Sequence, residues 1–304
     1  MRGSDNPYSS PIACSLWLAL FLGVVPPATA MVRQSRVSPP SDLTALSLEE
    51  LMETEVVVTS VAKKASRLSD SAAAVFVLTR EDLRRSGATS IPEALRLVPG
   101  LDVARVDANQ WAISARGFNV QFSGKLLVLI DGRTVYNPLF AGVYWNAQET
   151  LLEDVDRVEV IRGPGATLWG SNAVNGVINI TTRSARETHG SLFSVTAGEE
   201  ERGILSLRQG GVIGTTHYRA WGNAFQRDRF YAPGGGEAND DWQEGRGGFR
   251  LDGDHGPRET WTFEGEAYHG DAGGTIQEVA RTPPFSTHST LSHSIWIEDV
   301  EWLT

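Results

Sequence analysis

The sequence predicts an α+β domain followed by a series of antiparallel β-strands. Three observations carry this prediction. Between residues 71 and 182, short strand patterns are interleaved with capped helix patterns. After Thr182 the apolar and polar residues alternate with a period of two, which is typical of strands that bury one face. The connections between these later strands are alternately short and long.

The composition is that of a globular, acidic protein. The chain has 304 residues, 41% of them hydrophobic, and a formal net charge of −10. This length suggests two domains of ordinary size. Binding to nucleic acid needs clustered Lys and Arg side chains, and the sequence has no such cluster. We therefore expect no nucleic-acid partner.

Residues 1–30 have the pattern of a signal peptide. Arg2 supplies the positive end, Ile12 to Val25 form an apolar run, and Ala28-Thr29-Ala30 resembles a cleavage site, so export is expected. The only cysteine, Cys14, lies inside this segment. The mature chain is therefore expected to lack disulfides, thiol nucleophiles and thiolate metal ligands. No later stretch approaches the roughly 20 apolar residues of a transmembrane helix.

Two short segments come before the predicted domain. Residues 31–54 predict a flexible lead-in, because residues 31–46 are rich in Ser, Pro and Arg. A capping box at residues 47–50 predicts the start of one short helix within it. An extended, β-branched segment follows, made of Glu55, Val56, Val57, Val58, Thr59 and Ser60. Taken alone, this segment fits an ordinary edge strand.

The α+β domain is predicted from strands and capped helices in chain order. Residues 73–78 form a strand, Thr79 caps a helix that ends at Gly87, and Ser90 caps a second helix that Pro99-Gly100 terminates. Further strands are predicted at residues 111–115, 126–130, 158–161 and 176–182. The strand at 126–130 is apolar at consecutive positions, so we expect it to be buried on both faces.

A glycine-rich turn separates the last two of these strands. Arg162-Gly163-Pro164-Gly165 stops the first of them, because Pro164 cannot donate to a ladder and the glycines permit positive φ. A phosphate-binding loop needs a Lys followed by Ser or Thr after its glycines, and the sequence lacks that pair here. The turn is therefore interpreted as structural.

The alternating region predicts about six strands. Their lengths are close to the roughly 10 residues of outer-membrane barrel strands. They lie near residues 190–198, 203–210, 216–227, 246–253, 260–269 and 290–303. Residues 210–215 and 252–259 are short connections, whereas 228–242 and 270–289 are long and polar, as at the two ends of a membrane barrel. Candidates for interfacial girdles are Trp221, Trp261 and Tyr268. A soluble β-sandwich has the same alternation.

Four ordered motifs resemble the plug domain of TonB-dependent outer-membrane receptors. They are Ala112-Ile113-Ser114-Ala115-Arg116-Gly117-Phe118, Val128-Leu129-Ile130-Asp131-Gly132-Arg133, Val158-Glu159-Val160-Ile161-Arg162-Gly163-Pro164, and Gly170-Ser171-Asn172-Ala173 with Gly176-Val177-Ile178-Asn179-Ile180. The resemblance covers approximately residues 55–183. It is specific, because all four motifs occur in order and in register.

The resemblance implies an α+β plug domain at residues 61–183. Residues 184–304 are then the first antiparallel transmembrane β-barrel strands of an incomplete 22-stranded barrel. A barrel of about 22 strands encloses a wide lumen, which needs a plug. Residues 55–60 then resemble the TonB box, which adds as a strand to the periplasmic energy-transducing protein TonB. The roughly 120 residues after the plug are too few for such a barrel, so a truncated chain is expected. The implied location is the outer membrane of a Gram-negative cell, in contact with its lipid.

The resemblance also implies roles for single residues. Arg116 and Arg162 match plug arginines that pair with barrel glutamates, since a buried guanidinium needs a partner. A surface arginine beside a turn is the alternative. Ligand contact is implied for two apical loops, residues 117–124 and 137–146, in which the most ligand-like side chains are Asn119, Gln121, Phe122, Phe140, Tyr144 and Trp145. Packing of these side chains against the barrel is the alternative.

The predicted function is TonB-dependent import of a scarce ligand from the outer membrane into the periplasm. A ferric siderophore is the first candidate ligand, followed by cobalamin, heme or a glycan. An exported plug-like binding module on a β-sandwich, without transport activity, is the alternative. No catalytic residues are predicted, because Asp102, Asp107 and Asp131 lack a paired acid and base or a nucleophile elbow. The histidines lack metal-site spacing, so neither a metal site nor a cofactor is predicted.

Overall fold

The computed structural model describes residues 57–58, 66–67, 74–165, 169–170, 172–231, 235–256, 259–279 and 286–303. The chain divides into two compact units, Met1–Thr54 and Glu55–Thr304, and every described residue belongs to the second. The predicted signal peptide, the lead-in and its short helix therefore lie outside the described residues. Among the described residues, no helix has the length and apolar character needed to cross a membrane.

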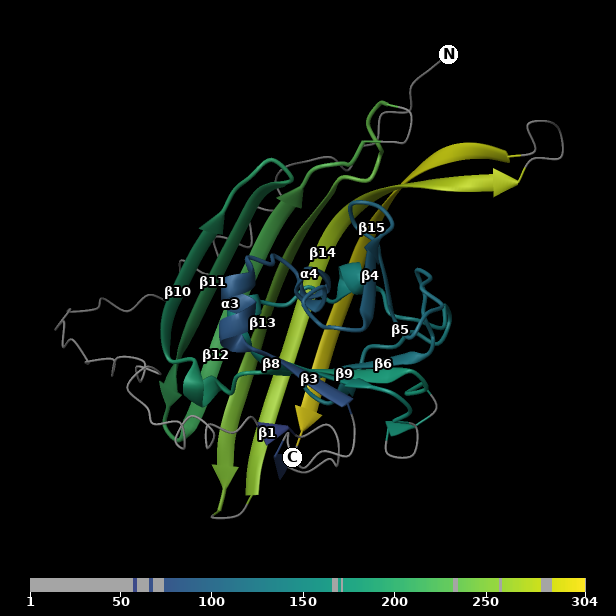
Figure 1. Ribbon diagram of the computed structural model, residues 1–304. Coiled ribbons are helices and arrows are strands. Elements are labelled where there is room, and N and C mark those ends of the chain that lie inside the picture. Colours follow the sequence, from purple (N-terminus) through teal and green to yellow (C-terminus); the bar gives the residue numbers. More distant parts are fainter. Residues whose placement is uncertain are drawn as a thin grey trace. The chain divides into compact units, whose positions relative to one another are not determined.

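The first part of the described chain, which we call the N-terminal domain (residues 74–182), is built on a five-stranded sheet (Figure 1). The β6–β9 pair is parallel, and the other pairs of this sheet are antiparallel. A separate hairpin pairs β4 with β5. The strand order of the sheet is β3 (Ala74–Thr79), β8 (Val155–Arg162), β9 (Gly176–Thr182), β6 (Leu126–Ile130) and β7 (Arg133–Thr134), and the hairpin strands are β4 (Leu101–Arg105) and β5 (Trp111–Ala115).

Two short helices follow β3, as predicted. α3 (Arg80–Ser86) begins at Thr79 with the predicted capping box and ends at a glycine whose φ is 69°. Ser90 precedes α4 (Ile91–Leu95), but its side chain makes no capping hydrogen bond, so that part of the prediction is wrong. Pro92 has no N–H group, which removes one of the donors that a cap would satisfy. The 3₁₀ helices of the described residues are η3 (Trp145–Ala147), η4 (Leu152–Asp154) and η5 (Ala185–Glu187).

The strand predictions for the N-terminal domain are confirmed with two omissions. β5, β6 and β9 have the predicted bounds, and β3 and β8 overlap the predicted segments. The sequence analysis predicted neither β4 nor β7. Both are short and pair with a neighbour that lies close in sequence.

The central strand β6 is buried on both faces, as its apolar run predicts. Leu126 and Val128 belong to the larger apolar core, whereas Leu127 and Leu129 belong to a second core on the other face. All four side chains are at most 5% exposed. The sheet therefore separates two apolar layers, which fixes the loops at its ends.

The second part of the described chain is one antiparallel sheet of six strands in chain order, which we call the strand wall (Figure 1). This confirms the predicted number and order of strands. The prediction of a loop over residues 270–289 is wrong, because the ladder between the last two strands continues from Gly270–Ile295 to Val279–Ser286. The strands are β10 (Gly190–Thr196), β11 (Glu201–Ile213), β12 (Thr216–Arg227), β13 (Trp242–His255), β14 (Glu259–Val279) and β15 (Ser286–Leu303).

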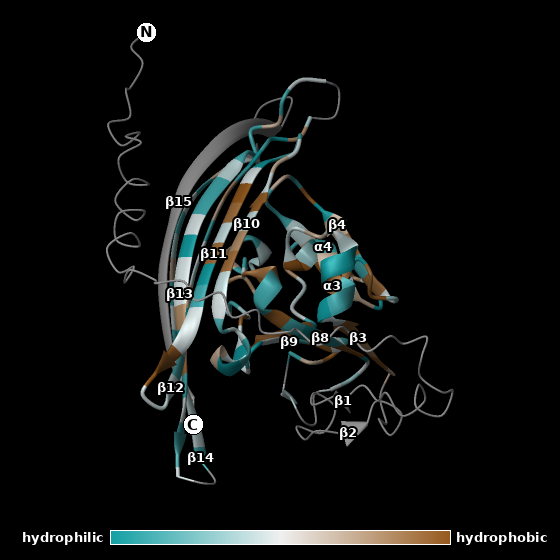
Figure 2. Cartoon of the chain, turned by 90° about the vertical axis from the view of Figure 1, so that its left-hand side faces the viewer, coloured by the Kyte–Doolittle hydropathy of each residue, from teal (hydrophilic) through white to brown (hydrophobic). Residues whose placement is uncertain are grey.

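Polar and apolar residues alternate along the strands of the strand wall (Figure 2), and the two faces of the wall differ in character. On one face, Phe193 and Val195 are 70% and 62% exposed, and Phe249 packs on Phe263. The opposite face meets the N-terminal domain and carries arginines and carboxylates. Trp221 and Tyr268 are 7% and 6% exposed on that inner side, so their assignment to interfacial girdles is wrong. Alternation in the sequence shows that a strand has two different faces. It does not show which of the two faces meets another domain.

Candidate functional site

The two loops predicted to contact ligand pack directly on each other. A Cβ atom on Gly124 would lie 2.6 Å from the backbone oxygen of Ala141, and one on Gly142 would lie 2.8 Å from Cα of Phe122. Only glycine permits such close approach of two backbones. A hydrogen bond of 2.8 Å from Asn137 N to Gly142 O closes the second loop. The loops therefore form one structured surface.

Three of the predicted ligand-contact side chains form an aromatic cluster, which we define as Phe122, Phe140 and Tyr144. The ring centroids lie 4.9 Å apart for Phe122 and Tyr144, 5.1 Å for Phe140 and Tyr144, and 5.7 Å for Phe122 and Phe140. Burial raises the pKa of the Tyr144 hydroxyl above its ordinary value. Phe140 is 46% exposed, so the cluster offers an open aromatic surface.

The backbone beside this cluster is strained. Arg116, Gly117 and Phe118 all have positive φ, at 60°, 85° and 59°. Positive φ in a bulky residue such as Phe118 is rare and concentrates at functional sites. The Lys125 ammonium lies 3.8 Å from the Phe118 ring centroid. Sequence reasoning missed Phe118, although it directly follows the Arg-Gly motif.

The other predicted ligand contacts differ in their surroundings. Gln121 donates a hydrogen bond to the Gln110 side chain, and Asn119 is half-buried, with its Oδ1 atom accepting no hydrogen bond from the described residues. Trp145 is 4% exposed and belongs to the apolar core. The structure therefore does not support Trp145 as a ligand contact, because η3 places it inside the domain.

Arg116 and Arg162 lie together on the N-terminal domain. Arg116 donates to the Arg162 carbonyl over 3.4 Å, and Arg162 donates to the Pro99 carbonyl over 2.8 Å. Among the described residues neither guanidinium is seen with a carboxylate partner, and the buried Nε atom of Arg162 has no hydrogen-bond partner there. Their pairing with barrel glutamates stays a prediction.

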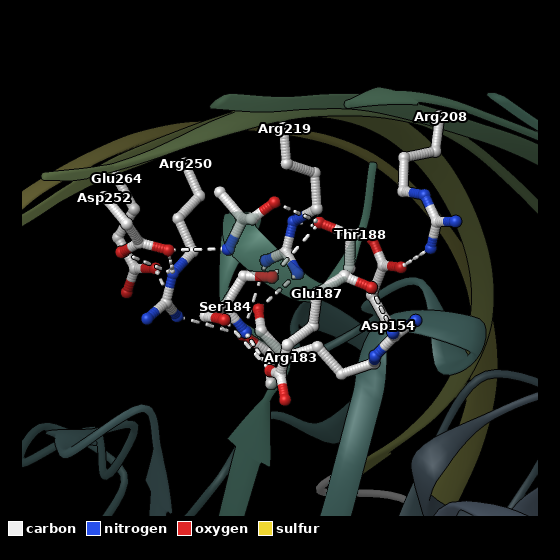
Figure 3. A network of polar contacts seen from close by, with 12 residues as sticks. Asp154, Arg183, Ser184, Glu187, Thr188, Arg208, Arg219, Arg250, Asp252 and Glu264 are labelled. Atoms are coloured by element: carbon white, nitrogen blue, oxygen red, sulfur yellow. Dashed lines mark hydrogen bonds and ion pairs between the residues drawn. The ribbon is translucent and has the colours of Figure 1, made fainter. Parts of the chain in front are cut away.

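Ion pairs join the two parts in both directions: Arg133 of β7 lies 3.5 Å from Glu266 of β14, and the larger group runs from wall arginines to domain carboxylates (Figure 3). Asp154, 2% exposed, pairs with Arg208 of β11 and, at 3.5 Å, with Arg219 of β12. Arg250 of β13 lies 3.9 Å from Asp131. Three neighbouring strands thus present guanidinium groups to two domain carboxylates. A buried guanidinium without such a partner is strongly destabilising.

A second group of ion pairs lies further along the same strands. Arg227 contacts Glu149 of the N-terminal domain and Glu201 of β11, each at 2.8 Å. Its guanidinium also lies 4.3 Å and 4.8 Å from the ring centroids of Phe225 and Trp242. Arg227 and Glu149 are 2% and 3% exposed, so this pair is almost fully desolvated.

These charged groups make contacts between the two parts of the described chain. Within the described ranges, no group of three or more His, Cys, Asp or Glu side chains is arranged to hold a metal ion. His189 and His217 share a hydrogen bond of 2.9 Å at the surface. The charged side chains are instead arranged in pairs across the interface between the N-terminal domain and the strand wall.

Comparison with known proteins agrees with this arrangement. Residues 67–177 match the TonB-dependent Receptor Plug Domain family. The chain is 32% identical over 176 residues to the vitamin B12 transporter BtuB of Vibrio vulnificus (strain CMCP6), which covers 55% of this chain and 28% of that protein. It is 28% identical over 215 residues to the ferric enterobactin receptor of Pseudomonas aeruginosa, covering 64% and 27%. The chain therefore spans less than a third of either relative.

Solved structures share the fold. The ferripyoverdine receptor of the outer membrane of Pseudomonas aeruginosa bound to ferripyoverdine superposes with a TM-score of 0.57 at 18% identity, covering 71% of this chain and 28% of that one. The copper transporter OprC superposes with a TM-score of 0.52 at 20% identity, covering 65% and 31%. In these structural neighbours the likeness is one of architecture.

Proposed function

The chain belongs to the TonB-dependent receptors, and on this basis we propose that it forms the plug and the first barrel strands of a receptor that imports a scarce small molecule into the periplasm. The N-terminal domain is the plug domain, and the strand wall is part of an antiparallel outer-membrane barrel. The protein is accordingly located in the outer membrane of a Gram-negative cell. We further propose that residues 1–30 direct its export.

The observation that carries the proposal is the set of buried ion pairs between plug and wall, together with the open aromatic cluster. Asp154 and Glu149 fix the plug to the inner face of the wall through Arg208, Arg219 and Arg227. A plug held in this way closes a lumen to solutes, and an exposed aromatic surface on the same plug suits ligand recognition. No catalytic role is proposed.

Residues 55–60 are proposed as the TonB box, with TonB as the periplasmic partner. Val57 and Val58 are the only two of these residues that are described; they form β1, which pairs with β2 (Ser66–Arg67). Glu55, Val56, Thr59 and Ser60 lie outside the described residues. An extended β-branched segment supports the proposal, because strand addition uses the backbone groups of one strand edge, and among the described residues β1 is paired only along the edge that faces β2.

Proline at both Val57 and Val58 is expected to abolish energy-dependent uptake by the full-length receptor. Proline has no N–H group, so it cannot donate to an added strand. Uptake of radiolabelled cyanocobalamin and of ferric enterobactin into cells is the measurement. The control is alanine at the same two positions, which keeps both backbone donors and should retain most uptake.

Two outcomes of this assay would contradict the proposal. Full uptake by the double-proline variant would show that coupling does not use this segment. Binding of a ligand at the cell surface without uptake by the unmodified receptor would favour the second candidate, an exported plug-like binding module without transport activity.

A ferric siderophore is the proposed ligand, and cobalamin is the second candidate. The aromatic cluster, together with Lys125, whose ammonium lies over Phe118 of the first apical loop, suits a large chelate with aromatic groups and negative charge. The similarity to vitamin B12 transporters favours cobalamin. Competition between ferric enterobactin and cyanocobalamin for binding to one preparation of the receptor distinguishes these two candidates.

Alanine at Phe140 is expected to weaken ligand binding about tenfold, since a lost aromatic contact is worth roughly 1–1.5 kcal/mol. The dissociation constant of the probe that binds is measured on the purified full-length receptor. Leu139→Ala is the matched control, because Leu139 is adjacent, 81% exposed and outside the aromatic cluster. Equal affinities of the two variants would remove the cluster from the ligand site.

A further inference from the structure

The connection between β12 and β13, residues 228–241, is anchored on the plug. We call it the β12–β13 loop; its residues 228–231 and 235–241 are described. It meets the tip of the β4–β5 hairpin, residues 106–110. Asp240 accepts hydrogen bonds from Ala108 N at 2.8 Å and from Phe230 N of its own loop at 2.9 Å. One carboxylate therefore folds the loop and joins it to the plug.

Asn109 completes this contact from the plug side. Its side-chain amide donates to the Asp240 carbonyl at 3.0 Å and to the Gly273 carbonyl of β14 at 2.7 Å. Asn109 is fully buried and Asp240 is 3% exposed. Buried polar groups of this kind are costly to separate without replacement partners. The hairpin tip is thus bound to two wall elements at once.

Arg105 strengthens the same junction. Its guanidinium lies between the Trp111 ring, at 5.3 Å, and the Phe230 ring of the β12–β13 loop, at 4.5 Å. It also pairs with Glu200, which lies in the connection between β10 and β11. In an antiparallel sheet of consecutive strands these two connections lie at the same end of the wall. The loop end of the wall is therefore held against the plug hairpin.

A short chain of contacts leads from this junction to the aromatic cluster. Gln110, at the end of the hairpin tip, accepts a hydrogen bond from the Gln121 side chain. Gln121 directly precedes Phe122 of the aromatic cluster. The hairpin itself is closed by a hydrogen bond of 2.9 Å from Val106 N to Gln110 O. The apical loop that carries Phe122 is therefore joined by a hydrogen bond to the hairpin tip that holds Asp240.

We propose that Asp240 and Asn109 are positioning residues that hold the β12–β13 loop on the plug, and that ligand at the aromatic cluster alters this loop through Gln121 and Gln110. The proposed response of the loop to ligand rests on the proposed function, whereas the anchoring of the loop on the plug does not. The position of the β12–β13 loop then depends on the position of the plug hairpin.

The anchoring is tested without ligand by hydrogen–deuterium exchange of the full-length receptor, followed by mass spectrometry. The amides of Ala108 and Phe230 report directly on the Asp240 carboxylate. Asp240→Ala and Asn109→Ala are each expected to raise exchange in residues 106–110 and 228–231 roughly tenfold, since each removes buried hydrogen bonds. Asp240→Asn keeps one acceptor oxygen and is expected to restore part of the protection.

Glu237→Gln is the matched control in the same loop. Glu237 is 65% exposed and pairs with Arg229 of the loop, away from the plug. This variant should leave exchange at 106–110 unchanged. Unchanged exchange at residues 106–110 in Asp240→Ala, or equal increases in Asp240→Ala and Glu237→Gln, would overturn the anchoring.

The ligand arm uses ferric enterobactin and cyanocobalamin as probes, with binding measured separately. The probe that binds is expected to change exchange in residues 228–231 at least about threefold in the unmodified receptor, and Gln110→Ala should abolish this change while the probe still binds. Binding without any change in loop exchange overturns the transmission. Failure of both probes to bind counts against the proposed ligands, whereas the experiment without ligand still decides the anchoring.

Discussion

Replacing Arg227 with alanine is expected to lower the free energy of unfolding of the plug and wall by about 3–5 kcal/mol. The substitution leaves Glu149 buried without its cation, and it also removes the guanidinium that lies over Phe225 and Trp242. Urea unfolding of the full-length receptor, followed by tryptophan fluorescence, measures the loss.

The matched control for this prediction is Arg202→Ala. Arg202 pairs with Asp228 at the surface and is 57% exposed, so its loss should cost less than about 1 kcal/mol. The double variant Arg227→Ala with Glu149→Ala should recover part of the stability, because it no longer buries a lone charge. Equal losses for Arg202→Ala and Arg227→Ala would contradict the buried ion pair.

Gly210→Ala is expected to destabilise the junction between plug and wall by about 1–3 kcal/mol. A Cβ atom at this position would lie 2.1 Å from the backbone oxygen of Thr188, in the segment that leads from the plug into β10. The neighbouring backbone must move, since no flexible side chain is available to yield. Hydrogen exchange of residues 184–190 and the urea midpoint are the measurements.

Gly203→Ala on the same strand is the control, because a Cβ atom there meets nothing within 4 Å. It should change the urea midpoint little. If the two alanine variants unfold at the same urea concentration, the close passage of residue 188 over β11 is not a constraint on the fold.

Much of the fold was predictable because its signals are local. The capping box at Thr79, the apolar run of β6 and the alternation of β10 to β13 each act within a few residues. β4 was missed because Leu101–Arg105 contains Asp102 and Arg105 in a short segment that pairs only with β5. The extension of β14 through Gly273 and Gly274 was missed because glycine usually marks a turn.

The site was predictable in part, for a similar reason. The apical loops follow from motifs, and three of their aromatic side chains do form a cluster. The burial of Trp145 was not predicted, because an aromatic residue in a loop sequence gives no sign of burial in a 3₁₀ turn. The pairs of Asp154 and Glu149 with wall arginines join residues 54 to 78 positions apart. Such contacts depend on strand register, which no short motif encodes.

The interface between plug and wall combines an apolar contact, in which Trp111 packs on Trp242, with ion pairs, and the ion pairs have a consequence for reversibility. Apolar surfaces that separate expose area to water and lose free energy in proportion to that area. Carboxylates and guanidinium groups that separate are hydrated instead, so water compensates much of the lost attraction. Asp131, Asp154 and Glu149 therefore hold the plug by contacts that hydration can replace one at a time. We therefore expect these ion pairs to separate and re-form one after another, without unfolding of the wall.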